Sequence, residues 1–358
     1  MSRLDELIAE LCPNGVEYIP LGEVLKNNNA PNSISKKYYK ENGDIPIIDQ
    51  SQVYIAGYTD DESAVPPILP CIIFGDHTRV VKYADRKFAQ GDSGTKVFIP
   101  VTEDLNTKYI YYAFCNIDIP SRGYNRHWTI AKNIKIPIPP LPVQQEIVRI
   151  LDNFTELIAE LTAELTARKK QYEYYRDLLL TFGDEVEWCN LEEILKIRNG
   201  KDYKSFNVGN IPVYGSGGIM TYIDTYVYDK PSVLIPRKGS IDKLYYVEKP
   251  FWTVDTIFYT EIYTSKVIPK YVFYCLQKER LEQYNTAGGV PSLTQTVLNK
   301  VKIPVPPLEE QERIVAILDR FDALCNDLTS GIPAEIEARQ KQYEYYRDKL
   351  LSFKEVTA

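Results

Sequence analysis

The sequence predicts an α+β protein in which two β-rich domains alternate with two long helices that pair as an antiparallel coiled coil. The chain has 358 residues, 44% of them hydrophobic and 25% charged, which is more than one core usually holds. One long segment occurs twice, and each copy has the apolar spacing of a coiled coil. Together these observations predict a pseudo-two-fold arrangement.

The repeated segment begins with a proline-rich motif and ends with a tyrosine-rich motif. Residues 136–154 recur as residues 303–321 with 12 of 19 positions identical. Residues 171–182 recur as residues 342–353 with 10 of 12 positions identical. The second copy is longer by four residues. Such a duplication indicates that the chain builds the same structural unit twice.

Both copies predict long helices. In the first copy, ten of the eleven positions that alternate spacings of four and three between Ile147 and Phe182 are apolar or aromatic, as in a coiled-coil seam. At 1.5 Å per residue, this helix would be about 60 Å long. In the second copy, the seam continues through Leu328 and Ile332 and resumes at Ile336, and the four extra residues cause a stutter beside Gly331 and Pro333. We expect a kink or a short break there.

The segments outside the helices are rich in Tyr, Ile and Val, with frequent Gly, Pro, Asn and Asp, which predicts short strands and loops. The two β-rich segments resemble each other only faintly in sequence. The short N-terminal helix either completes a cyclic arrangement with the last helix or simply caps it. The predicted order is an N-terminal helix at 1–15, a β-rich domain at 16–140, the first long helix at 141–183, a second β-rich domain at 184–307 and the second long helix at 308–358.

Composition restricts the class of protein. The net charge is -7, but residues 16–135 and 187–302 carry 0 and +3, so the excess of acidic over basic residues lies on the helices and nucleic-acid binding is permitted. The six cysteines are dispersed without a CxxC pair and there are two histidines, so neither a metal site nor a disulfide framework is expected. The acidic start and the lack of an 18-residue apolar run predict a soluble, cytoplasmic protein.

The sequence lacks the usual sets of catalytic residues. It has no GxxxxGK[ST] phosphate-binding loop and no Asn/Asp-Pro-Pro-aromatic loop of an amino-methyltransferase. Pairs of the acid-x-Lys type are no more frequent than chance predicts. His77 has no serine or cysteine beside it in the sequence that it could activate. We therefore expect no catalytic residues and a non-enzymatic role.

Three motifs give the chain a family resemblance. They are the Ile-Pro-x-Pro-Pro-Leu-x-x-Gln motif at 136 and 303, the Lys-Gln-Tyr-Glu-Tyr-Tyr-Arg-Asp-x-Leu-Leu motif at 170 and 341, and Leu-Cys-Pro-Asn-Gly-Val-Glu-Tyr at 11–18. With these motifs the whole chain resembles the specificity subunit of type I restriction-modification systems. The resemblance implies two target recognition domains, each recognising half of a bipartite site in double-stranded DNA. It also implies that the two helices set the spacing and dock two methyltransferase subunits.

The same resemblance implies where the chemistry of the complex resides. The methyltransferase subunits, and the restriction subunits that join through them, would bind S-adenosylmethionine, ATP and Mg²⁺, and this chain would bind no cofactor. An alternative from a different class is a non-enzymatic coiled-coil scaffold whose β domains bind protein or sugar. Affinity for DNA that falls steeply with salt would distinguish the first function from the second.

Two sets of residues are predicted to make contacts with partners. DNA recognition favours Arg, Lys, Asn, Gln, Ser and Thr on loops, with aromatic residues beside them, and the loop Asn285-Thr286 also has this character. The predicted DNA-contacting residues are Lys36, Lys37, Gln50, Gln52, Asp76, His77, Thr78, Arg79, Arg122, Asn125, Arg126, His127, Arg198, Lys201, Lys204, Tyr214, Ser216, Arg237, Lys238 and Ser240. The predicted partner interface lies outside the helix seam, at Gln171, Tyr174, Arg176, Asp177, Gln342, Tyr345, Arg347 and Asp348.

A tetrapeptide that occurs twice, Ala-Glu-Leu-Thr at 159–162 and 163–166, yields a prediction about DNA spacing. Deleting one copy shortens the helix by about 6 Å, which corresponds to one or two base pairs at about 3.4 Å per pair. We expect the variant to recognise the same two half-sites with a changed spacer, as measured by methylome sequencing. An unchanged spacer or a changed half-site would show that the helices do not set the distance.

Overall fold

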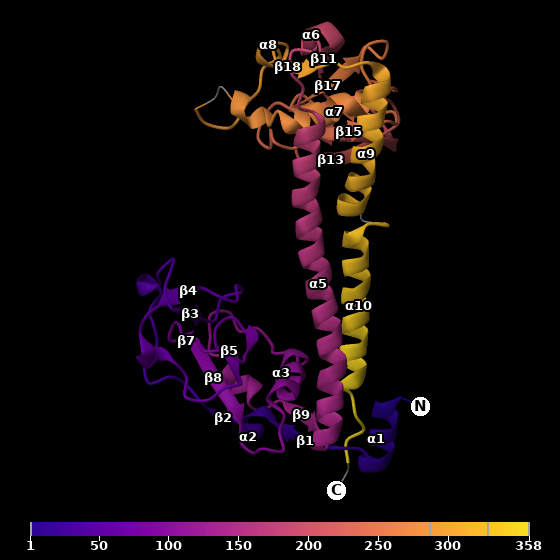
Figure 1. Cartoon of the computed structure of the whole chain (residues 1–358). Coiled ribbons are helices and arrows are strands. Elements are labelled where there is room, and N and C mark those ends of the chain that lie inside the picture. Colours follow the sequence, from indigo (N-terminus) through magenta and orange to yellow (C-terminus); the bar gives the residue numbers. More distant parts are fainter. Residues whose placement is uncertain (1, 286–287, 328, 357–358) are drawn as a thin grey trace. The chain divides into compact units, whose positions relative to one another are not determined.

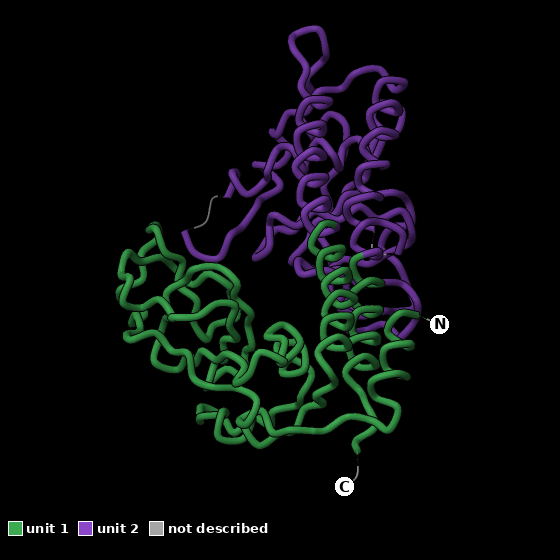
Figure 2. Tube along the Cα trace, turned by 60° about the horizontal axis from the view of Figure 1, so that its bottom comes forward, with its two compact units in different colours: residues 1–160, 336–358 green, residues 161–335 purple. Residues whose placement is uncertain are grey.

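The computed structural model describes residues 2–285, 288–327 and 329–356. The chain forms two compact units: unit 1 contains residues 1–160 and 336–358, and unit 2 contains residues 161–335 (Figure 2). Each unit holds one β-rich domain and one part of the paired long helices (Figure 1). The predicted α+β class, with two β-rich domains that alternate along the chain with long helices, is confirmed.

Unit 1 begins with helix α1 and continues into a domain with two main sheets. The four-stranded sheet has the order β2-β8-β5-β6, the three-stranded sheet has the order β4-β3-β7, and β1 pairs with β9. Its elements are α1 (Arg3–Leu11), β1 (Glu17–Pro20), α2 (Leu21–Val24), β2 (Leu25–Asn27), η1 (Lys36–Tyr38), β3 (Ile45–Ile48), β4 (Gly57–Thr59), η2 (Glu62–Ala64), β5 (Cys71–Gly75), β6 (Val81–Ala84), β7 (Ala89–Gln90), β8 (Thr95–Pro100), α3 (Thr107–Cys115), α4 (Trp128–Ala131) and β9 (Lys135–Ile138).

Unit 2 contains the second β-rich domain. Its four-stranded sheet has the order β11-β17-β14-β15, its three-stranded sheet has the order β13-β12-β16, and β10 pairs with β18. Its elements are β10 (Trp188–Asn190), α6 (Leu191–Ile194), β11 (Leu195–Asn199), β12 (Val208–Gly215), β13 (Gly218–Ile223), β14 (Ser232–Pro236), β15 (Tyr245–Val247), β16 (Trp252–Thr253), β17 (Ile257–Ile262), α7 (Pro269–Lys278), η3 (Leu281–Tyr284), α8 (Gln295–Leu298) and β18 (Lys302–Pro304).

The two β-rich domains share one topology although their sequences differ. Each strand of the first domain has a counterpart at the same place in the sheets of the second, so that β5 corresponds to β14 and β3 to β12. In both domains the otherwise antiparallel three-stranded sheet contains one parallel pair, β3 with β7 and β12 with β16. Strands β5 and β14 are buried along their whole length, which places both in the core of their domain. The repeat therefore extends beyond the helices.

The long helices pair within each unit. Helix α5 (Leu141–Leu179) continues without a break through the tetrapeptide repeat. In unit 1, Phe154 of α5 stacks on Tyr346 of α10 (Ile332–Leu350), with ring centroids 5.5 Å apart. In unit 2, Tyr175 of α5 stacks on Phe321 of α9 (Leu308–Asn326), with centroids 5.6 Å apart. These pairs involve seam positions of antiparallel helices, so the expected coiled coil is confirmed (Figure 1).

The predicted break in the second helix is confirmed, because α9 ends at Asn326 and α10 begins at Ile332. The Asp327 carboxylate accepts hydrogen bonds from Thr329 and Ser330, which lower its pKa to about 2. A side chain at Gly331 would lie 2.6 Å from the Ala323 carbonyl oxygen, so only glycine permits this close approach of the backbone. The seam residue Leu328 lies outside the described residues.

One buried glutamine fixes the start of each helix pair to its β-rich domain. In unit 1, the Gln144 amide donates to the Pro139 carbonyl over 2.8 Å and accepts from the Asn106 amide over 2.8 Å. In unit 2, Gln311 donates to the Pro306 carbonyl and accepts from the Ile268 amide over the same distances. In each unit, the glutamine of the repeated motif therefore joins the proline-rich turn to the start of the helix that follows the four-stranded sheet, which is α3 (Thr107–Cys115) in unit 1 and α7 (Pro269–Lys278) in unit 2.

An aspartate on each long helix makes a second connection. Asp152 of α5 binds Lys108 at 2.9 Å and accepts a 2.6 Å hydrogen bond from Tyr112 of α3. Burial, together with Asp152, raises the pKa of the Tyr112 hydroxyl, which keeps it a donor.

The same aspartate contact occurs in unit 2, where Asp319 of α9 binds Lys270 at 3.0 Å and accepts from Tyr274 of α7. We call the glutamine and aspartate contacts of each unit the domain clamp. It joins the helices to α3 in unit 1 and to α7 in unit 2.

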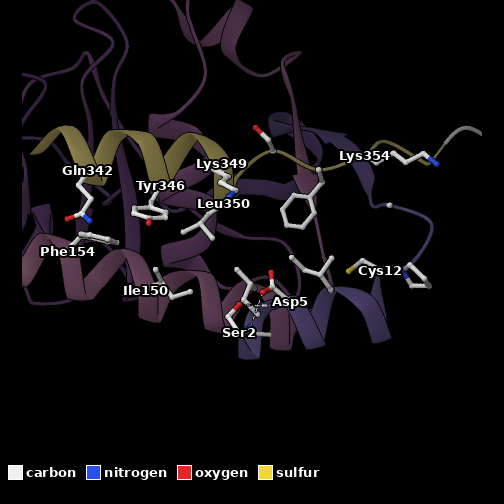
Figure 3. Close-up of a pocket in the computed structure, with 16 residues that line it drawn as sticks. Ser2, Asp5, Cys12, Ile150, Phe154, Gln342, Tyr346, Lys349, Leu350 and Lys354 are labelled. Carbon is white, nitrogen blue, oxygen red and sulfur yellow. Dashed lines mark hydrogen bonds between the residues drawn. The ribbon is translucent and has the colours of Figure 1, made fainter. Parts of the chain in front are cut away.

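The two ends of the chain meet in unit 1. The Val16 amide donates to the Lys354 carbonyl at 2.8 Å, and the Val356 amide donates to the Val16 carbonyl at 3.0 Å. The C-terminal segment therefore pairs with the segment that leads into the first domain. Between α1, α5 and α10 lies a cavity of about 670 Å³, lined by Ile8, Phe154 and Leu350 among others (Figure 3).

The domain clamp gives a prediction about local stability. Replacing the buried Gln144 with alanine leaves the half-buried Asn106 amide without its acceptor, so we expect unit 1 to lose about 1–3 kcal/mol of unfolding free energy. Hydrogen exchange should show faster exchange in α3 and no change in α7. The matched control is Gln145→Ala, because that neighbouring side chain is exposed. Equal protection of α3 in both variants would contradict the role of the clamp.

Candidate nucleic-acid interface

Two loops meet beside the four-stranded sheet in each unit. The strand-end loop follows β5 in unit 1 (76–79) and β14 in unit 2 (237–240). The pre-helix loop precedes α4 in unit 1 (119–127) and α8 in unit 2 (288–294). Most of the predicted DNA-contacting residues of unit 1 belong to these loops, and so do three of those in unit 2.

Hydrogen bonds join the two loops of unit 1. The His127 amide donates to the Asp76 carbonyl at 2.8 Å, and the Trp128 amide donates to the Asp76 carboxylate at 2.8 Å. The His127 ring donates through Nδ1 to the same carbonyl, at 2.9 Å, and accepts from the Arg122 amide through Nε2, at 3.2 Å. Because both ring nitrogens are engaged inside the domain, the orientation of the His127 ring is fixed.

This geometry corrects the expectation for two residues. Asp76 is 3% exposed and His127 is 1% exposed, and the polar atoms of both are engaged inside the domain. Buried groups whose hydrogen bonds are satisfied cannot contact DNA directly, so we assign Asp76 and His127 the role of positioning the loops. Nothing in the polar sequence around them indicates this burial.

A third segment, which follows β3, supports the strand-end loop of unit 1. Gln50 is buried, accepts from the His77 amide at 3.3 Å, and donates to Asp92 at 3.0 Å. The Thr78 hydroxyl donates to the Gln50 carbonyl at 2.6 Å. Sequence reasoning missed Lys82, which donates to the carbonyls of Asp49 and Val53, while burial lowers its pKa. Gln50 is therefore also a positioning residue.

The remaining predicted residues of unit 1 are more accessible. Gln52, Thr78 and Arg79 line a shallow cavity of about 440 Å³, and the Arg79 guanidinium donates to the Ile119 carbonyl at 2.8 Å. The exposed side chains beside the two loops are Gln52, Thr78, Arg79, Arg122, Asn125 and Arg126. Lys36 and Lys37 are exposed on η1, and none of the hydrogen bonds found for the described residues joins them to the loops.

The loops of unit 2 are joined in a similar way. The Leu293 amide donates to the Arg237 carbonyl at 2.9 Å, and the Gly239 amide donates to the Pro291 carbonyl at 3.0 Å. The Arg237 guanidinium lies over the Phe258 ring, 5.0 Å from its centroid. Lys238 is exposed and Ser240 is half-buried. Thr286, which the sequence also suggested, lies outside the described residues.

The other predicted residues of unit 2 are placed differently. Ser216 contacts the segment behind the strand-end loop, because its amide donates to the Thr256 hydroxyl at 3.3 Å and the Arg237 amide donates to the Thr256 carbonyl at 3.0 Å. Half-buried Tyr214 precedes this turn, and Lys201 and Lys204 are exposed after β11. Arg198 forms two hydrogen bonds with Glu261, which raise its pKa and occupy part of its guanidinium.

The predicted partner interface appears in two similar copies. Tyr174 and Tyr345 are 64% and 63% exposed. Arg176 and Arg347 lie over the rings of Tyr172 and Tyr343 and pair with Asp177 and Asp348, each at 2.8 Å. Gln171 and Gln342 accept from Arg168 and Arg339. Arg176 is largely buried over the buried Tyr172 ring, so we expect it to position Asp177 rather than contact a partner.

Metal-binding clusters and membrane-spanning helices are both missing from the part of the chain that the structure describes. Among those residues, no group of three or more His, Cys, Asp or Glu side chains is arranged to hold a metal ion. None of the described helices is long and apolar enough to cross a membrane.

Comparison with known proteins assigns the family. The family model for the type I restriction modification DNA specificity domain matches residues 13–168 and 183–338. The chain belongs to this family. It is therefore a type I restriction-modification specificity subunit with two copies of the specificity domain, and the match gives no support to a scaffold that binds protein or sugar.

Individual members of the type I specificity family resemble the whole chain. It is 36% identical to the type I restriction enzyme EcoR124I/EcoR124II specificity subunit of Escherichia coli, over 99% of this chain and 97% of that protein. It is 30% identical to the Escherichia coli EcoprrI specificity subunit, over 92% and 93% of the two chains. The crystal structure of the S subunit from M. genitalium has the same fold, with a TM-score of 0.63, 17% identity, and 94% and 96% coverage.

Proposed function

We propose that each β-rich domain recognises one half of a bipartite DNA site through its two joined loops. The observation that carries this proposal is the pair of joined loops, which occurs once in each unit beside strands of equivalent position. Exposed Arg, Lys, Asn and Gln side chains surround the loops in both units, and these residue types bind phosphates and base edges. The helices set the spacing between the half-sites.

The helices also dock two methyltransferase subunits in this proposal. Tyr174 and Tyr345 have almost equal exposure, and each packs edge-on against the next tyrosine at 5.4 Å. A surface that is presented twice fits two copies of one partner. Catalysis, with S-adenosylmethionine, ATP and Mg²⁺, would belong to the methyltransferase and restriction subunits, and this chain would contribute recognition only.

Loop variants test recognition directly. We expect Arg79→Ala to weaken recognition of one half-site and Arg237→Ala to weaken recognition of the other, each by about 1–3 kcal/mol if the residue binds a base edge. Binding of the complete complex to DNA with changes in one half-site measures this effect. Arg86→Ala removes an exposed charge outside the loops and serves as the control. Equal losses on all sequences would show that the arginines contact only phosphate.

The mass of the complex tests the docking proposal. We expect the purified chain alone to aggregate or bind DNA weakly, because its exposed aromatic side chains lack a partner. With its methyltransferase it should form a complex of two partners and one chain, and Tyr174→Ala or Tyr345→Ala should each remove one partner. A stable complex of one partner and one chain would contradict the interpretation of the duplicated surface.

A further inference from the structure

Tyr124 has an unusual position at the tip of the pre-helix loop in unit 1. Of the described aromatic side chains it is the most exposed, at 83%. Its ring stacks on the ring of His77 from the strand-end loop, with centroids 4.3 Å apart and planes 6° apart. One face of the tyrosine is therefore covered by the histidine, and the opposite face is open to solvent.

Hydrogen bonds hold the backbone of both loops that carry the stacked rings. The His77 amide is held by Gln50, and the Arg122 amide is held by the buried His127 ring. Between Arg122 and Tyr124, Gly123 has a φ of +66°, and no atom lies within 4 Å of the place that a Cβ would occupy, so the loop makes a sharp, open turn. The hydrogen bonds on both sides of the turn limit the movement of the aromatic pair.

Hydrogen bonding through Nδ1 does not account for the position of the His77 ring. Its Nδ1 atom is buried and has no hydrogen-bond partner among the described residues, which is rare for a buried polar atom. A ring that satisfied an internal network would be bonded there. The contact that the structure does show for the His77 ring is the parallel stack with Tyr124, so His77 serves as the support of that ring.

The chemistry of the surrounding side chains points to a nucleobase. Arg122 and Arg126 are exposed on the same loop, two residues before and two residues after Tyr124, and can neutralise phosphates near it. A flat, rigid aromatic surface between positive charges is the arrangement that nucleic-acid-binding proteins use for stacking on bases. An exposed aromatic ring in a protein that does not bind a partner there would gain nothing from this support.

We propose that Tyr124, supported by His77, stacks on a base within the half-site that the first domain recognises. The inference rests on the proposed function and adds to it a specificity-determining residue and a distortion of the DNA. In an intact duplex, the faces of each base are covered by the neighbouring base pairs. The ring must therefore enter between two base pairs, or stack on a base that has left its pair.

The test uses the complete complex of this chain with its methyltransferase, and a DNA duplex that contains the bipartite site which the complex methylates. We expect Tyr124→Ala to lower affinity by about 5- to 150-fold, and Tyr124→Phe to stay within about twofold, because stacking needs the ring and not the hydroxyl. Tyr263→Ala is the control, since Tyr263 is an exposed tyrosine of unit 2 outside the loops. Melting of all variants should be unchanged because both side chains are exposed.

A fluorescent base analogue, 2-aminopurine, placed in turn at each position of the half-site, reports stacking. With the natural chain and Tyr124→Phe we expect a fluorescence change that is absent with Tyr124→Ala. A change at two adjacent bases identifies insertion between base pairs, and a change at one base identifies stacking on an unpaired base. Both results support the proposal.

Other results would overturn it. If Tyr124→Phe loses as much affinity as Tyr124→Ala, the hydroxyl binds a phosphate and the ring does not stack. If Tyr124→Ala binds like the natural chain and recognises the same site, the tyrosine is not a specificity residue, although the proposed function stands. Failure of the natural complex to recognise any bipartite site would instead overturn the proposed function itself.

Discussion

The buried glutamine of the domain clamp is the contact on which the rest of each unit depends. Gln144 and Gln311 are 1% and 0% exposed, and each one binds the proline-rich turn and the segment before α3 or α7 at the same time. A buried amide that lost one of these partners would leave a polar group unsatisfied. The clamp therefore restricts each unit to one arrangement of its domain on its helices.

A rigid attachment has a consequence for recognition. The loops that face outward can place a side chain accurately only if the sheet that carries them is fixed to the helices. The aspartate contacts provide this second attachment point, with Asp152 and Asp319 at equivalent positions of the repeated motif. Two separate points prevent rotation of α3 and α7 about a single contact. The same construction in both units explains why the helix motif is duplicated so closely.

The sequence predicts some parts of this structure better than others. The helices are predictable because their seam depends on local spacing, and the break is predictable because Gly331 and Pro333 coincide with the stutter. The shared strand order of the two domains is not, because strand pairing is set by contacts between distant residues. The same reason explains the errors at Asp76 and His127, where polar loop residues are buried by partners far along the chain.

In each domain, some contacts hold the loops in place and other side chains are available for recognition. This division explains how the two domains can differ in sequence and keep one fold. The residue that directly follows β5 in unit 1 is the buried Asp76, and the residue that directly follows β14 in unit 2 is the half-buried Arg237. The backbone carbonyl of each residue nevertheless accepts a hydrogen bond from the pre-helix loop of its unit. The backbone carbonyl makes the joint that both units share, and the side chain at this position adds a different contact in each unit: the Asp76 carboxylate accepts from the Trp128 amide, and the Arg237 guanidinium lies over the Phe258 ring. Recognition residues can therefore vary while the loops, the strands and the domain clamp stay in place.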